Sequence, residues 1–245
     1  MISFLRERSP FSREDLYYYF LLDEEELNEG TFGWRVHDLK QKGIIQETQT
    51  GWYTVAVKPV YAPTPDIRIS KINKIIEKNF QDSRYCIWNM DWLNEFTLHQ
   101  FNRGTFIVEI EKDVRESLGF TLYRNGFKDT LWSFPNIPLS FEDAVNPIFL
   151  LSLISRSPLQ QIAIGKNRSA PCPTLEKILV DIFEEETIFH FIQGAELEHI
   201  FERALTRYAI NISTLFGYAK RRNKATSLRS FLEQHFSHLL PILLS

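Results

Sequence analysis

The spacing of the apolar side chains changes within residues 30–57 from the period of a helix to the period of a strand. Over residues 30–42 the apolar positions recur at i, i+4 and i+7, which places them on one helical face. These positions are Phe32, Val36 and Leu39. From Ile44 apolar residues alternate with residues of mixed polarity, and "TQTG" at 48–51 supplies the turn of a two-stranded ribbon. This part of the chain is therefore limited to a small module in which a β-hairpin directly follows a helix.

Another helix is expected before this one, over residues 12–20. Ser12 is a suitable N-cap, and acidic residues follow it in the first turn, where they complement the helix dipole. Gly43 stands just past the end of the later helix, where a left-handed cap residue is favoured. The order helix, helix, two-stranded ribbon is typical of a winged helix-turn-helix, and we assign residues 1–60 to such a domain.

Prolines mark residues 61–68 as a linker, and the pattern changes after it. Amphipathic segments then alternate with short apolar segments, which predicts an α/β layer. Helices are expected at 69–80, 91–100 and 114–123, and strands at 84–89, 105–112, 130–134, 147–153 and 160–164.

From Pro173 onward the chain carries apolar stripes at helical spacing, which predicts a bundle of four helices. The four segments are 173–186, 195–208, 212–222 and 226–240. The predicted fold class is a mixed α+β / α/β chain. It has an N-terminal winged helix-turn-helix and a C-terminal domain, residues 69–245, that ends in the bundle.

Composition excludes several classes of protein. Twenty Phe, nine Tyr and five Trp can bury enough area to exclude a disordered chain. Cys86 and Cys172 stand far apart without a CxxC, so neither a disulfide framework nor a zinc site is expected. No uncharged apolar run approaches ~18 residues, and the first eleven residues do not resemble a signal peptide. We expect a cytoplasmic protein that has no transmembrane helix, metal or cofactor.

The formal net charge of −3 is unevenly distributed. Residues 1–60 carry 7 Lys and Arg against 10 Asp and Glu, residues 61–199 carry 14 against 19, and residues 200–245 carry 7 against 2. The C-terminal segment is therefore basic, and its densest stretch is "YAKRRNK" at 218–224. That stretch is either a solvated helix end or a phosphate-contacting site. Its candidate residues are Lys220, Arg221, Arg222 and Lys224.

The polar face of helix 30–42 carries side chains that suit DNA. In a winged helix this helix enters the major groove, where Arg and His reach base edges or phosphates. The candidates are Thr31, Trp34, Arg35, His37 and Lys40. The alternative is a packing or dimerisation unit, which the acidic run at 23–26 favours.

Enzymatic chemistry finds little support in the motifs. Glu109 and Glu111 share a strand face, as in a restriction-type nuclease, but Lys112 points to the opposite face. An edge strand with a charged outer face is the simpler interpretation. Residues 164–171 lack the glycine spacing of a phosphate-binding loop and are expected to be a solvated loop. His235 and His238 share a helix face without other metal ligands nearby, so surface or packing roles are expected.

Lys177 and Asp181 stand four residues apart, opposite the apolar stripe of their helix. They are expected to form an i, i+4 pair in a structural network. The functional alternative is a polar pocket that they form with Tyr218, Arg221 and Arg222.

The segment "GTFGWRVHDLKQKGIIQETQTGWYTV" resembles the N-terminal winged helix of AbiEi-type antitoxins from bacterial type IV toxin–antitoxin systems. The segments "WNMDWLNEFTLHQ", "FIVEIEKD", "CPTLEKILVDIF" and "INISTLFGYAKRRNK" resemble the C-terminal domain of a family related to them. The resemblance implies repression of the chain's own operon through operator DNA. The helix 30–42 would be the reader and 48–51, with Gln49 and Thr50, the tip of the wing.

The resemblance also implies a nucleotidyltransferase-like toxin as the functional partner, without a stable complex. The leading hypothesis is therefore a non-enzymatic regulator that binds double-stranded DNA. A protein-interaction module that never meets DNA and a divergent metal-dependent nuclease are the alternatives.

Overall fold

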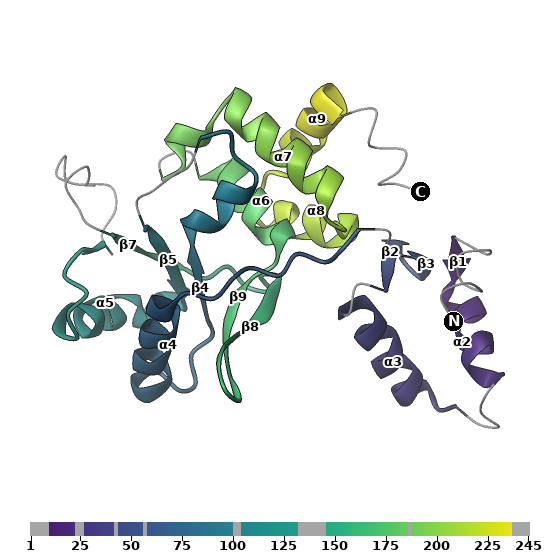
Figure 1. The fold of residues 1–245 in the computed structure, drawn as a ribbon, viewed down its shortest axis with the longest axis horizontal. Helices are drawn as coiled ribbons and strands as arrows, with labels where there is room; N and C mark the ends of the chain where they lie inside the picture. The colour runs from purple at the N-terminus through teal and green to yellow at the C-terminus, as the bar shows by residue number, and fades with distance from the viewer. Residues whose placement is uncertain are drawn as a thin grey trace. The chain divides into compact units, whose positions relative to one another are not determined.

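The computed structural model describes residues 10–22, 27–41, 44–55, 58–99, 104–131, 146–185 and 188–236 (Figure 1). The chain divides by its contacts into two compact units. Residues 1–61 and 179–245 make up the first unit, and residues 62–178 make up the second. None of the helices in the described part of the chain is both long and apolar enough to cross a bilayer.

The N-terminal module, residues 10–55, contains two helices and a small antiparallel sheet with strand order β1-β3-β2. Its elements are β1 (Phe11–Ser12), α2 (Arg13–Leu21), α3 (Glu29–Gln41), β2 (Ile45–Gln49) and β3 (Trp52–Val55). Both predicted helices and the predicted ribbon are confirmed. The proposed cap Gly43 and the acidic run at 23–26 lie outside the described residues.

Local chemistry explains where α2 begins. The Ser12 hydroxyl accepts a hydrogen bond from the Asp15 backbone N–H (3.1 Å), and the Asp15 carboxylate accepts one from the Ser12 N–H (2.8 Å). This reciprocal capping box satisfies two N–H groups that a helix start leaves without partners. Phe32 of α3 is fully buried, and its ring packs edge-on against Tyr17 at 5.0 Å between centroids. The two helices thus close a core that belongs to the module itself.

The second unit is built on a four-stranded sheet with strand order β4-β5-β7-β6, in which β4 is antiparallel to its neighbour and the other pairs are parallel. Its elements are α4 (Ile67–Asn79), β4 (Tyr85–Asn89), η1 (Met90–Glu95), β5 (Phe106–Ile110), η2 (Lys112–Val114), α5 (Arg115–Arg124), β6 (Thr130–Leu131) and β7 (Ile148–Ser152). The expected edge position of segment 105–112 is wrong. β5 lies between β4 and β7, and all its residues are buried.

Two further boundaries differ from the sequence prediction. Asp66 caps α4, whose first residue is Ile67, so the last residues of the expected linker belong to a helix. The expected loop at 164–171 is wrong, because β8 (Leu159–Gly165) and β9 (Arg168–Pro173) form an antiparallel hairpin there. Asn167 in its turn adopts a φ of 58°, which asparagine tolerates better than most residues. The two prolines of β9 concealed this strand in the sequence, because proline is uncommon within strands.

The four predicted C-terminal helices are confirmed. They are α6 (Leu175–Glu184), α7 (Ala195–Arg207), α8 (Ile212–Arg221) and α9 (Ala225–Phe236), with the short η4 (His190–Ile192) between α6 and α7. Within the first unit, the Phe201 ring contacts Phe231 at 5.1 Å and Phe183 at 6.3 Å between centroids. These rings join α6, α7 and α9, as the apolar stripes predict.

Replacing Phe32 with Ala should open the N-terminal module locally. A buried Phe that becomes Ala leaves a cavity, so we expect the free energy of opening of α2 and α3 to fall by about 3–5 kcal/mol. Hydrogen exchange of peptides that cover the two helices measures this. Trp34→Ala on the exposed face of the same helix is the control and should change it by less than about 0.5 kcal/mol. Equal protection in Phe32→Ala and the wild type would contradict the packing.

The two cysteines should be unreactive until the protein unfolds. Both are free thiols with fully buried side chains, and burial raises the pKa of Cys172 to about 12. We expect no rapid reaction with a thiol-directed chromogenic disulfide reagent at about pH 8, and reaction of both in urea. Rapid labelling of the native protein that Cys172→Ser abolishes would contradict the burial of β9.

Candidate functional site

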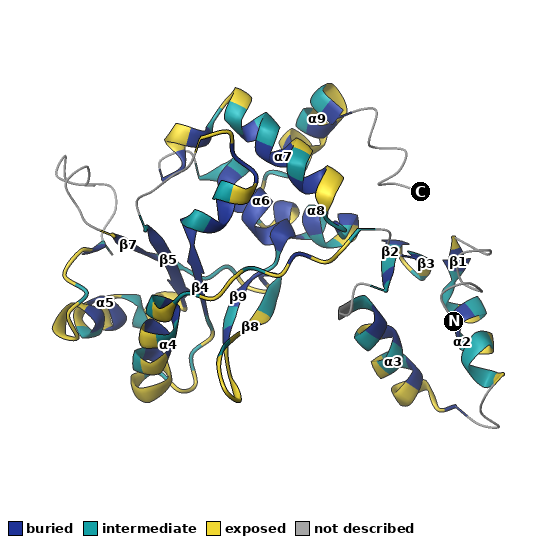
Figure 2. Cartoon of the chain, viewed as in Figure 1, coloured by how far each residue is buried: buried dark blue, intermediate teal, exposed yellow. Residues whose placement is uncertain are grey.

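Helix α3 carries exposed residues along its length (Figure 2). Their side chains are polar or aromatic. Thr31, Trp34 and His37 are exposed and recur at i, i+3 and i+6, so they lie on one side of the helix. The Trp34 side chain is 66% exposed. The Thr31 backbone N–H does not face solvent freely, because it donates to the Asn28 side chain (2.8 Å). The Thr31 hydroxyl and the two rings are therefore the groups that this face offers to a partner.

The two cations predicted to contact DNA are engaged within the module instead. The Arg35 guanidinium is half-buried and lies over the Phe20 ring, 5.2 Å from its centroid. The Lys40 ammonium donates to the Glu47 carboxylate in β2 (2.5 Å). At the junction of the helices, Arg13 pairs with Glu29 (2.5 Å). The solvent-facing positive charge of α3 is thus smaller than the sequence suggests.

The turn between β2 and β3 carries the other predicted contacts. Gln49 and Thr50 are exposed, and Gly51 adopts a φ of +77°, which favours glycine. Trp52 follows the turn and is 42% exposed, although the sequence analysis did not select it. The sequence signal that could have identified Trp52 is an aromatic residue directly after a predicted turn.

The basic stretch at 218–224 is only partly available to a partner. Lys220 and Arg221 are exposed in the last turn of α8, where cations complement the helix dipole. The Arg221 guanidinium lies near the Tyr218 ring, 5.7 Å from its centroid. Lys224 is half-buried after the helix ends. Arg222 is paired with carboxylates.

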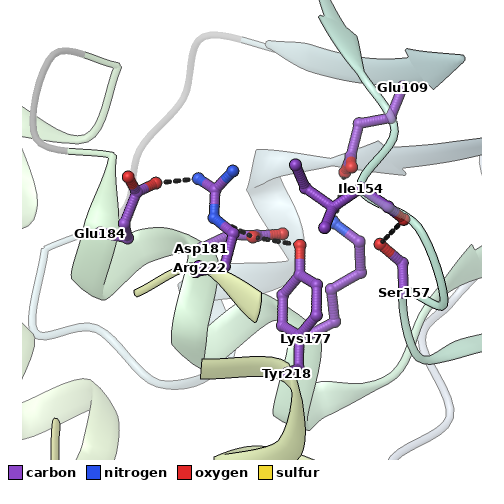
Figure 3. A network of polar contacts seen from close by, with 8 residues as sticks. All are labelled: Glu109, Ile154, Ser157, Lys177, Asp181, Glu184, Tyr218 and Arg222. Carbon is purple, nitrogen blue, oxygen red and sulfur yellow. Dashed lines mark hydrogen bonds and ion pairs between the residues drawn. The ribbon is translucent and has the colours of Figure 1, made fainter. Parts of the chain in front are cut away.

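A polar network joins α6 and α8 within the first unit (Figure 3). The buried Tyr218 hydroxyl donates to the Asp181 carboxylate (2.8 Å). Arg222 lies beside Asp181 (3.8 Å) and pairs closely with Glu184. Of the five residues in the alternative polar pocket, the structure brings together Asp181, Tyr218 and Arg222, and the sequence analysis missed Glu184. A buried hydroxyl that holds a carboxylate is consistent with a structural role.

Lys177 belongs to a different contact, within the second unit (Figure 3). Its side chain is fully buried, and its ammonium donates to the Glu109 carboxylate of β5 (2.5 Å). Lys177 and Asp181 are not exposed, because every residue from Leu175 to Ile182 is buried. The supposed polar face of this helix therefore does not meet solvent.

This pairing also bears on the nuclease alternative. Glu109 is neutralised by Lys177, while Glu111 and Lys112 lie beyond the end of β5 and are exposed. In the described ranges, no group of three or more His, Cys, Asp or Glu could hold a metal ion. His235 packs on Phe231 and lies 3.2 Å from Glu198, and His238 lies outside the described residues.

Comparison with known proteins places the chain in a family. Residues 31–238, from α3 to just beyond α9, match the sequence profile of DUF6577, a family of unknown function. The chain belongs to this family. No curated protein matches it. The family includes the exposed face of α3, the ribbon and both polar contacts of α6, and its description assigns none of them a role.

Breaking the buried ion pair should destabilise the second unit strongly. Lys177→Ala leaves the Glu109 carboxylate buried without its partner, so we expect the free energy of unfolding to fall by about 3–5 kcal/mol. The double variant Glu109→Leu with Lys177→Met should recover most of this loss, because it removes both charges. Urea unfolding measures all three proteins.

Lys112→Ala, which removes an exposed lysine, is the matched control and should change stability by less than about 0.5 kcal/mol. If the double variant is as unstable as Lys177→Ala, the unpaired charge of Glu109 is not the cause of the instability.

Proposed function

We propose that this protein is a DNA-binding transcriptional regulator and that its N-terminal module contacts double-stranded DNA. The exposed face of α3 is the observation that carries the proposal. This face stands in a module whose element order, β1, α2, α3, β2, β3, and strand order, β1-β3-β2, are those expected of a winged helix. In such a module the second helix of the pair enters the major groove.

The side chains on α3 suit direct contact with bases. Thr31 and His37 can donate or accept hydrogen bonds at base edges or phosphates. Trp34 exposes a large apolar ring, which a thymine methyl group or a sugar could cover. Gln49 and Thr50, at the ribbon turn, supply polar groups for the DNA backbone.

The charge of the module supports a particular kind of binding. Phosphate neutralisation by Lys and Arg supplies most non-specific affinity for DNA. Here Lys40 and Arg13 are paired with carboxylates, and residues 1–60 carry a net charge of −3. The proposed complex therefore depends on base and shape contacts more than on phosphate contacts, and its affinity should depend weakly on salt.

The resemblance to AbiEi-type antitoxins supports a finer version of the proposal. The DNA would then be the operator of the chain's own operon, and a nucleotidyltransferase-like toxin would be the functional partner. This version rests on the resemblance alone.

Fluorescence anisotropy of the full chain with DNA from upstream of its own gene, and with a scrambled duplex, tests the proposal. We expect tighter binding to the native duplex. Trp34→Ala or His37→Ala should each weaken that binding by about 1–3 kcal/mol, because each removes a base-facing group. Phe120→Ala, which removes an aromatic ring that is 60% exposed in the second unit, is the matched control and should leave binding unchanged.

Equal affinity for both duplexes, or no binding at low salt, would contradict the proposal. If the protein does not bind DNA at low salt, a stable complex with the neighbouring gene product in size-exclusion chromatography would favour a protein-interaction module.

A further inference from the structure

A pocket of about 770 Å³ lies within the second unit, along the first turns of α4. Its walls come from α4, from the end of β4 and the start of η1, from Gly104 and the start of β5, and from the segment after α5 with Asn146. Its volume is in the range of small-molecule sites. The residues that carry the argument below are Asp66, Arg68, Lys71, Lys74, Asn89 and Asp91.

Two lysines line the pocket without partners. Lys71 and Lys74 are exposed on successive turns of α4. Neither makes a hydrogen bond or an ion pair with any residue that the structure describes. By contrast, Arg168 on the neighbouring β9 is paired with Glu77 of the same helix (3.3 Å). Like charges three residues apart on a helix repel each other, and an anion between them relieves that repulsion.

A third cation in the wall is held in a fixed position. The Arg68 guanidinium lies near two rings, 4.9 Å from the Phe106 centroid and 5.5 Å from the Phe127 centroid. It also donates to the Gly104 carbonyl at 3.4 Å. Burial lowers its pKa, while Asp66 and Asp129 oppose that effect. A guanidinium held in this way loses little side-chain entropy when it binds an anion.

The end of the pocket at the start of α4 is lined by carboxylates in place of cations. Asp66 caps the helix by accepting from the Arg68 backbone N–H (2.5 Å). Asp91 lies near it, and burial is the main cause of its raised pKa. The side-chain amide oxygen of Asn89 accepts from the Asp91 backbone N–H (2.9 Å). These oxygens accept hydrogen bonds from hydroxyl and amino groups and would repel a phosphate.

The carboxylates and the lysines of the pocket are separated along α4. Asp66 and Lys74 are eight positions apart, which is roughly 12 Å at 1.5 Å per residue. A ligand that fills the pocket therefore meets acceptors at one end and the two lysines at the other, with Arg68 between them in the sequence. A nucleotide has this polarity, since its hydroxyl and amino groups are donors and its phosphates are anions.

We propose that this pocket binds a nucleotide. Lys71, Lys74 and Arg68 contact its phosphates, and Asp66 and Asp91 accept hydrogen bonds from its sugar or base. The pocket lies in the second unit and the α3 face proposed to contact DNA lies in the first, and the pocket does not depend on that function.

Isothermal titration calorimetry of the full chain with ATP, GTP, CTP and UTP tests the proposal, with adenosine and inorganic phosphate as partial ligands. At least one nucleotide should bind, and more tightly than either partial ligand. The double variant Lys71→Gln with Lys74→Gln should weaken that binding by at least about tenfold, because it removes two charged hydrogen bonds. Asp91→Asn should weaken binding of the nucleotide and leave that of inorganic phosphate unchanged.

Lys78→Gln is the matched control. Lys78 is an exposed lysine one turn further along α4, outside the pocket, so this variant should bind as the wild type does. The lysine variants change solvent-exposed side chains, and circular dichroism checks that they remain folded. Three results would overturn the proposal. They are no binding of any nucleotide at millimolar concentration, an equal loss in Lys78→Gln, and inorganic phosphate or adenosine binding as tightly as the nucleotide.

Discussion

Glu109 and Lys177 place opposite charges where water does not reach, and the arrangement of the 62–178 unit depends on their meeting. Removing either ion from water costs several kcal/mol, and only a direct contact with good geometry offsets that cost. Glu109 stands in the interior strand β5, and Lys177 stands near the start of α6. The contact therefore fixes both the depth and the rotation of the start of α6 against the sheet. Leucine and isoleucine side chains, which can slide past one another, do not specify an orientation so narrowly.

Much of the fold could be predicted from the sequence, because local signals determine it. The period of the apolar residues located α3, the ribbon and the four C-terminal helices, and Ser12 marked the start of α2. The failures concern contacts between distant residues. Glu109 and Lys177 are 68 positions apart, so spacing alone assigned Glu109 to a charged edge strand and Lys177 to a pair with Asp181 opposite the apolar stripe.

The sequence did not predict the pocket either, because its residues are also distant from one another in the chain. Asp66 and Arg68 were assigned to a linker because prolines precede them, whereas they begin α4. Asn89 ends β4 and Asp91 follows it, some twenty positions later, and only the folded sheet brings them to the same cavity. The sequence also did not reveal which lysines and arginines form ion pairs. Arg13 and Lys40 are paired beside the predicted DNA-binding face, while Lys71 and Lys74 have no partner in the described structure. Positive charge is thus available at the pocket and largely neutralised at α3.

The closed core of the N-terminal module has a consequence for biosynthesis. The buried residues of its core cluster all fall between Phe11 and Val55, although β2 also contacts α8, which is synthesised later. Local contacts form quickly, and a growing chain folds its N-terminal part first. Helix α3 can therefore take shape on the ribosome before β5 and α6 have been synthesised. The start of α6, in contrast, docks only after Lys177 has been synthesised, 68 positions after the Glu109 that it contacts.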